Sequence, residues 1–206
     1  MNRPTPPDLT QRLREAIATS LRALHAVGVS EAPLTVPRAA SPLAPGQLAA
    51  THPGPARERL ELAALYQRCL RHYRSVVRSG DTAAADDDVG AALAHFVAAN
   101  LHALHGTESP PEALPALSHQ LVAIVRGSPA WQRAPLRERQ AYAEQLAILS
   151  VLMTDLAARA RRDGAAAMAH VKQGAANYLR QLLGLDPHAL TLDVSGLTLR
   201  DTALAA

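Results

Sequence analysis

The stretch LRERQAYAEQLAILSVLMTDLAARARR, residues 136–162, contains neither glycine nor proline and is rich in strong helix formers. Its large apolar side chains recur at spacings of three and four residues, which places them on one face of an α-helix. Ile148 and Val151 widen this face until little of the middle of the helix is polar. Since a helix that is apolar over most of its circumference is covered on several sides, this stretch predicts the central helix of a helical domain.

Further segments with helical spacing of apolar residues surround this one. They cover residues 57–79, 89–105, 110–127 and 165–184, and each ends at or beside a glycine. Of the 206 residues, 48% are hydrophobic but only 3% are aromatic, so the core must be built from Leu, Ala and Val. This composition favours helix-on-helix packing over a β-sandwich. We therefore expect an all-α fold, a compact bundle of about five helices that ends near residue 184.

The N-terminal part of the chain has a different pattern. Residues 29–56 contain six prolines among small residues, which indicates an extended linker that cannot hold a helix. We therefore divide the chain into a helix (1–28), a linker (29–56) and a bundle domain with its tail (57–206). The tethered first helix is expected to dock on its own domain, pack on another copy or bind a partner. Its apolar stripe consists of Leu9, Leu13, Ile17, Leu21 and Leu24.

The C-terminal tail changes period after Pro187. Leu190, Leu192 and Val194 alternate with polar residues, a pattern typical of extended chain. The tail is expected to form a small hairpin about Ser195 and Gly196. Because a two-stranded hairpin alone is marginally stable, it should lie against the helices or join another sheet edge.

Charge and cysteine content exclude few functions. The formal net charge of +3 is mild and lacks the clustered basicity of most nucleic-acid-binding proteins. Cys69 is the single cysteine, so an intrachain disulfide cannot form. No apolar segment of signal-peptide type follows Met1, and no apolar stretch reaches the roughly 18 residues that span a bilayer. The simplest expectation is a cytoplasmic protein.

Three runs of sequence resemble a known group of proteins. They are DVGAALAHFVAANLHALHG at residues 88–106, EQLAIL from Glu144, and YLRQLLGLDPHAL followed by GLTL near the end. These runs are similar to an uncharacterised family of helical proteobacterial proteins, over residues 57–199. The resemblance leaves the first helix and the linker outside, and it implies a helical domain without assigned activity, cofactor or catalytic residues.

Asn100 is the polar residue most enclosed by apolar neighbours, because helical geometry places it on the inward face of residues 89–105. A buried amide requires hydrogen-bond partners, and Gln145 on the central helix is a candidate. We favour a polar clasp that fixes the register of two helices. The alternative is a ligand-binding pocket formed by Asn100, Gln145, Tyr73 and Tyr178.

Charged residues also form patterns. Arg68, Arg71, Arg74 and Arg78 align at helical spacing and are candidates for gripping phosphates or an acidic partner. A solvated helix face is the simpler interpretation, and no aromatic residues interleave with the arginines. His95, His102 and His105 share one helix, but neither an HExxH nor a Glu-x-x-His motif is present. We therefore expect surface histidines, no metal site and no cofactor.

The chain contains no GxSxG, GxxxxGK[ST] or GxGxxG motif, so no catalytic residue is predicted. The expected function is a non-enzymatic protein–protein interaction module, an adaptor or accessory subunit of a bacterial cell. The stripe of the first helix and the row of arginines are its candidate partner-binding residues. A small-molecule-binding or enzymatic domain with a pocket near Asn100 is the alternative. A third interpretation is nucleic-acid binding through the row from Arg68 to Arg78.

Overall fold

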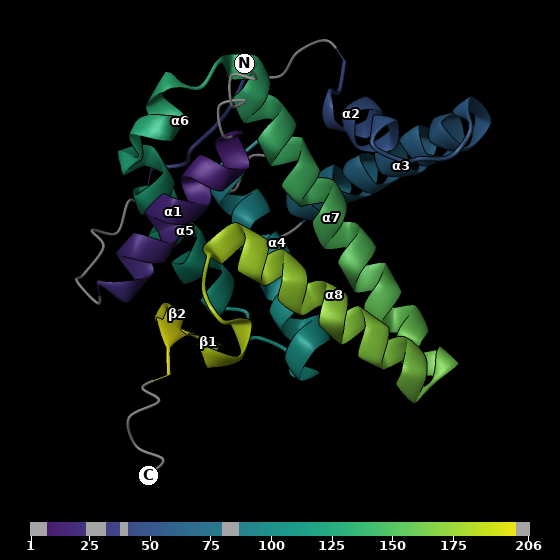
Figure 1. The fold of residues 1–206 in the computed structure, drawn as a ribbon. Helices are drawn as coiled ribbons and strands as arrows, with labels where there is room; N and C mark the ends of the chain where they lie inside the picture. Colours follow the sequence, from purple (N-terminus) through teal and green to yellow (C-terminus); the bar gives the residue numbers. More distant parts are fainter. Residues whose placement is uncertain (1–7, 24–31, 38–40, 80–86, 201–206) are drawn as a thin grey trace, which may run out of the picture.

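The computed structural model describes residues 8–23, 32–37, 41–79 and 87–200 (Figure 1). The expected all-α fold with a short C-terminal hairpin is confirmed. The elements in chain order are α1 (Leu9–Arg22), α2 (Ala44–Ala50), α3 (Ala56–Ser79), α4 (Val89–His105), α5 (Ala113–Gly127), α6 (Pro129–Arg133), α7 (Leu136–Asp163), α8 (Ala165–Leu183), the 3₁₀ turn η1 (Pro187–Ala189), β1 (Leu190–Asp193) and β2 (Gly196–Leu199).

Helix α7 is the central helix, as its sequence predicts. It packs on α4, α8, α3 and α2, and Ile148 in its middle is fully buried. Figure 1 shows α2 and α3 on one side of α7 and α1, α5 and α6 on the other. Helix α4 is the second inner helix, because it packs on α7, α5 and α8 together. Its start is fixed by Asp88, whose Oδ1 accepts a hydrogen bond of 2.8 Å from the Gly90 amide.

Helix α1 docks on its own bundle. It packs against α8, α5 and α6, and its stripe is buried, with Leu13 and Ile17 at 0% exposure. Arg22 Nη2 donates to the carbonyl of Gly184, 2.9 Å away at the end of α8. Asp8 is the N-cap, since its Oδ1 accepts from the Gln11 amide at 2.8 Å. Of the three expected positions for this helix, the structure shows docking in cis.

This docking changes the role of the residues that we expected to bind a partner. Four of them belong to the same hydrophobic core as α4 and α7, and Leu24 lies outside the described residues. An apolar helix face is stabilised by burial against any apolar surface, whether of the same chain or of a partner. Here the surface belongs to the same chain. The core also contains Val36 and Ala44 from the stretch between α1 and α3. The four buried members of the stripe are Leu9, Leu13, Ile17 and Leu21.

The stretch between α1 and α3 was expected to be an extended linker without a helix, and this is wrong for its second half. Helix α2 forms there, with Pro45 in its first turn, where a missing amide hydrogen costs no hydrogen bond. The earlier part, residues 32–37, pairs with the segment before α4. Val89 donates to Leu34 O at 2.9 Å, and Val36 donates to Asp87 O at 3.2 Å. The linker therefore lies on the bundle at two places.

The C-terminal hairpin forms where the alternating sequence predicts it. Strands β1 and β2 are antiparallel, with Leu192 opposite Leu197 and Asp193 opposite Gly196. The hairpin packs on α5, where the side chain of Gln120 approaches β2. Gly196 has a φ of 106°, and a Cβ there would lie 2.9 Å from Gln120 Oε1, so glycine is required for this approach. No helix among the described residues is both long and apolar enough to cross a bilayer.

Truncating the buried stripe tests the docking of α1. We expect Leu13→Ala to lower the free energy of unfolding by about 2–5 kcal/mol, because the side chain is completely enclosed and leaves a cavity. Glu15→Ala, two residues further on and on the exposed side of the same helix, should change it by less than about 0.5 kcal/mol. Urea unfolding of both variants measures the difference. Equal effects of the two substitutions would contradict the docking.

Candidate functional site

The four residues of the predicted pocket do not line one cavity. Asn100 is fully buried, but its Nδ2 donates to Phe96 O of its own helix at 2.8 Å, so it does not clasp Gln145. Gln145 is half-buried. Tyr178 is 37% exposed and meets the Phe96 ring edge-on, with 6.0 Å between centroids. Tyr73 lines two of the three cavities described below, whereas the other three residues line none of them.

The most enclosed charged group is Glu144 on α7, which is 4% exposed. Its Oε2 accepts hydrogen bonds from the amides of Leu43 at 2.7 Å and Ala44 at 3.0 Å, at the start of α2. Its Oε1 accepts from Gln140 Nε2 at 2.8 Å and lies 3.6 Å from Arg74 Nη2. A buried carboxylate is stable only with such donors, and a helix start supplies them. This cluster attaches α2 to α7 and α3.

A small cavity of about 20 Å³ adjoins this cluster, between Tyr73, Arg74, Asp88, Gln140 and Glu144. That volume suits one water molecule and excludes a metabolite. The Tyr73 hydroxyl is buried and has no hydrogen-bond partner among the described residues. Burial, together with the charge of Asp88, raises the pKa of Tyr73, so the hydroxyl remains a donor. The cluster is therefore a structural polar core.

A second cavity of about 490 Å³ is a cleft between α3 and α4, floored by α7. The ring of His95 meets that of Tyr73 edge-on at 5.5 Å, and burial lowers the pKa of His95, which favours the neutral imidazole. His102 Nδ1 lies 3.0 Å from Thr107 O, and its Nε2 contacts Arg161. The lining includes His72, Tyr73, Val76, His95, His102, Leu114, Ser150, Val151, Thr154 and Asp155.

Two hydroxyl groups in this cleft, those of Ser150 and Thr154, are engaged within α7. Ser150 Oγ donates to Ala147 O at 2.9 Å, and Thr154 Oγ1 donates to Ser150 O at 3.0 Å. Neither is hydrogen-bonded to a histidine, as an activated nucleophile would be. Among the described residues, no three His, Cys, Asp or Glu side chains are grouped closely enough to hold a metal ion.

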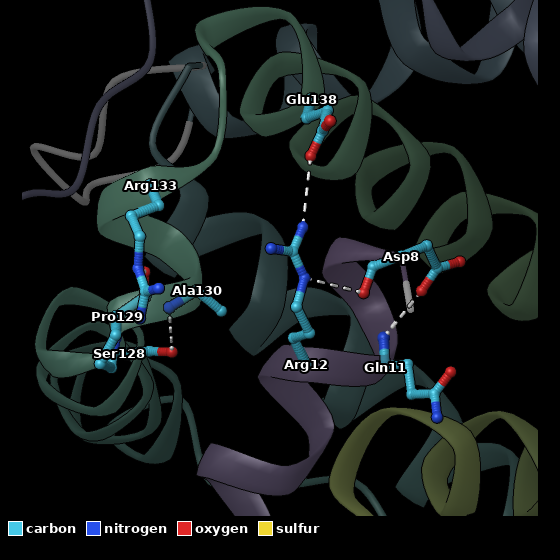
Figure 2. Close-up of polar contacts among 8 residues, drawn as sticks. All are labelled: Asp8, Gln11, Arg12, Ser128, Pro129, Ala130, Arg133 and Glu138. Carbon is cyan, nitrogen blue, oxygen red and sulfur yellow. Dashed lines mark hydrogen bonds and ion pairs between the residues drawn. The ribbon is translucent and has the colours of Figure 1, made fainter. Parts of the chain in front are cut away.

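The third and largest cavity is a groove of about 790 Å³ between α1, α5 and α6. Figure 2 shows Arg12 pointing from α1 toward Glu138 on α7, with Asp8 beside it and Arg133 on the neighbouring α6. Arg12 Nη2 lies 3.6 Å from Glu138 Oε2, and Arg12 Nε donates to Asp8 O at 3.4 Å. The groove is lined by Arg12, Glu15, Ala16, Thr19, Ser20, Ala23, Ala123, Ile124, Gly127, Ser128, Pro129, Ala130 and Arg133.

The row of arginines on α3 is divided by the fold. Arg68 and Arg71 are exposed, whereas Arg74 is half-buried and forms the ion pair with Glu144. The side chain of Arg78 lies outside the described residues. The role of Glu144 was not predicted from the sequence. Nothing in the local pattern of this long helix distinguishes Glu144 from a solvent-exposed glutamate.

The fold and its grooves define a small helical domain with an inner polar cluster and two open surface cavities. The chain belongs to the Family of unknown function (DUF6683), whose match covers residues 8–200. The resemblance to an uncharacterised family is thus confirmed, and its extent is corrected, since the match includes α1 and α2. No curated protein and no solved structure matches the chain.

Removing the buried carboxylate tests the polar cluster. We expect Glu144→Ala to lower the free energy of unfolding by about 3–5 kcal/mol, because two amides and a guanidinium lose their acceptor inside the fold. Gln145→Ala, at the neighbouring half-buried position, should cost about 1 kcal/mol or less. Urea unfolding followed by circular dichroism compares the two. Similar unfolding midpoints would show that the cluster does not stabilise the domain.

The half-buried His95 makes stability depend on pH. The pKa of His95 is lowered in the folded state, so below about pH 6.5 the unfolded chain binds more protons. Stability is therefore expected to fall as the pH decreases from 7.5 to 5.5. His95→Phe keeps a ring beside Tyr73 and should reduce this fall, whereas His170→Gln at an exposed position should not. Urea unfolding at several pH values measures the slope, and an unchanged slope in His95→Phe would contradict the assignment.

Proposed function

We propose that this domain is a non-enzymatic protein-interaction module, an adaptor or accessory subunit, which binds a helical segment of a partner protein. The main support for this proposal is the groove along α1. One face of α1 is buried in the core, and the residues on its other face form one wall of the largest cavity. The N-terminal helix thus contributes to binding with its outer side. We place this activity in the bacterial cytoplasm, on the grounds of sequence given above.

The shape of the groove suits a helix. Its wall runs from Arg12 to Ala23, three turns of α1 or about 16 Å at 1.5 Å per residue. Most of the floor consists of small residues, so the backbone of a partner helix can approach closely. The apolar part of such an interface lies at the centre and the polar part at the rim, as in other protein complexes. The small residues that line the groove are Ala16, Ser20, Ala23, Ala123, Gly127, Ser128 and Ala130.

The charges of the groove indicate which partner it fits. Arg12 and Arg133 both line it, and each has its Nε bonded to a carbonyl of its own helix region, Asp8 O at 3.4 Å and Pro129 O at 3.2 Å. Guanidinium groups held in this way are prearranged to bind carboxylates. Because Arg12 already pairs with Glu138 and Glu15 also lines the groove, we infer a partner helix with a narrow apolar face and an acidic residue that meets Arg133.

A second candidate is a small-molecule site in the cleft between α3 and α4. Its volume of about 490 Å³ lies within the usual range of ligand pockets, and Tyr73 and His95 lie on its wall. Nucleic-acid binding through the arginines of α3 has less geometric support, because the charge of Arg74 is balanced by Glu144. These alternatives predict that changes in the α1 groove have no effect on binding.

Site-specific photo-crosslinking tests the proposal. A benzophenone amino acid in place of Thr19, which is exposed in the groove, is expected to give a discrete adduct with one partner protein in living cells. Ala16→Arg or Ala130→Arg fills the groove and should abolish the adduct, since a partner helix could no longer approach. Immunoblotting and mass spectrometry detect the adduct.

Two matched controls accompany this experiment. The same crosslinker at Gln47, exposed on α2, should give no such adduct, and Ala50→Arg, also exposed on α2, should leave the Thr19 adduct intact. Thermal unfolding checks that each variant is folded. If the adduct persists in the folded Ala16→Arg and Ala130→Arg variants, the groove is not the binding site.

A further inference from the structure

The two edges of the C-terminal hairpin differ in their hydrogen bonding. At the outer edge of β2, the side-chain amide of Gln120 completes the pairing. Leu197 N donates to Gln120 Oε1, and Gln120 Nε2 donates to Leu197 O, both at 2.9 Å. At Leu197 this edge is thus closed by the chain itself.

The register shows that β1 has an open edge. In an antiparallel pair, residues alternate between positions that bond to the opposite strand and positions that face away. Leu197 faces away, so Leu192, which lies opposite it, faces away on the other side. The bond of 2.7 Å from Arg200 N to Ala189 O agrees with this alternation. Among the described residues, none bonds to the amide or carbonyl of Leu192.

We propose that the open edge of β1 pairs antiparallel with the same edge of a second copy of this chain, about a two-fold axis at Leu192. In that arrangement the Leu192 amide of each copy donates to the Leu192 carbonyl of the other, and the two hairpins become one four-stranded sheet. Such edge-to-edge addition is a common mode of strand recognition. The inference does not rest on the groove along α1.

Charge complementarity selects a second copy as the occupant. The register around Leu192 places Thr191 opposite the second copy's Asp193. Arg200 Nε donates to Thr191 Oγ1 at 2.8 Å. In the proposed register the guanidinium of Arg200 therefore lies beside the carboxylate of Asp193 in the second copy. Ser195 bonds to Asp193 through both its amide, at 2.8 Å, and its hydroxyl, and these bonds lower the pKa of Asp193 and keep it charged. The two-fold axis produces this ion pair twice.

An exposed apolar residue supports the same arrangement. Val194 is 64% exposed at the tip of the hairpin, which is unusual for a β-branched side chain beside buried leucines. In the proposed register it lies beside β1 of the second copy and loses part of that exposure. A foreign strand would need its own acidic and basic residues at matching positions, whereas this chain supplies both from one hairpin.

The mass of the full chain in solution tests this proposal. Sedimentation equilibrium over a range of concentrations should show a monomer–dimer equilibrium for the natural sequence. Asp193→Arg and Arg200→Asp each place like charges together and should weaken dimerisation about tenfold or more. The double variant, Asp193→Arg with Arg200→Asp, restores opposite charges and should regain most of the dimer.

Asp163→Arg, at the exposed end of α7, is the matched control and should dimerise like the natural sequence. Circular dichroism checks that each variant is folded. The double variant carries both changes to the hairpin. If it dimerises again, the single variants lost the interface and not the folded hairpin. A monomer at every concentration, or a dimer that is equally stable in all variants, would overturn the proposal, and neither result bears on the groove along α1.

Discussion

The burial of one face of α1 against α8 and α5 is the contact on which the rest of this structure depends. It joins a helix near the start of the chain to elements roughly a hundred residues or more later. The hydrophobic effect acts on the stripe without regard to sequence distance. Once that stripe is covered, only the outer side of α1 can meet other molecules. The largest of the three described cavities is there, because α5 and α6 lie beside that outer side.

Two carboxylates attach the described parts of the stretch between α1 and α3, at Leu34 and at the start of α2, to the bundle. Asp88 Oδ1 accepts from the Leu34 amide at 3.3 Å, and Glu144 accepts from the amides at the start of α2. Both acids are buried, at 7% and 4% exposure, so each needs donors from the protein. Prolines in this stretch restrict the backbone and reduce the entropy lost when it is fixed in place. A proline-rich segment can thus be an ordered part of a domain when buried acids bind its amides.

Much of the fold could be predicted from the sequence, because local chemistry decides it. The periodic apolar residues of α4, α5, α7 and α8, the cap at Asp88 and the alternation in the tail each act within a few residues. The docking of α1 and the existence of α2 could not be predicted in this way. Helix α2 starts at amides bonded by Glu144, about a hundred positions along the chain, and no local pattern contains that information. The candidate pocket was missed for a different reason: Asn100 was expected to clasp another helix, but its Nδ2 donates to Phe96 O four residues earlier in its own helix.

Native-state hydrogen exchange of the full chain tests the central claim most directly. If α1 is an integral part of the bundle, its amides from Leu13 to Leu21 exchange only through global unfolding, and their protection equals that of the amides of α4. If α1 is a tethered helix, these amides exchange orders of magnitude faster than those of α4, at the rates of a short isolated helix. The first result is the one that this structure predicts, and the second would contradict it.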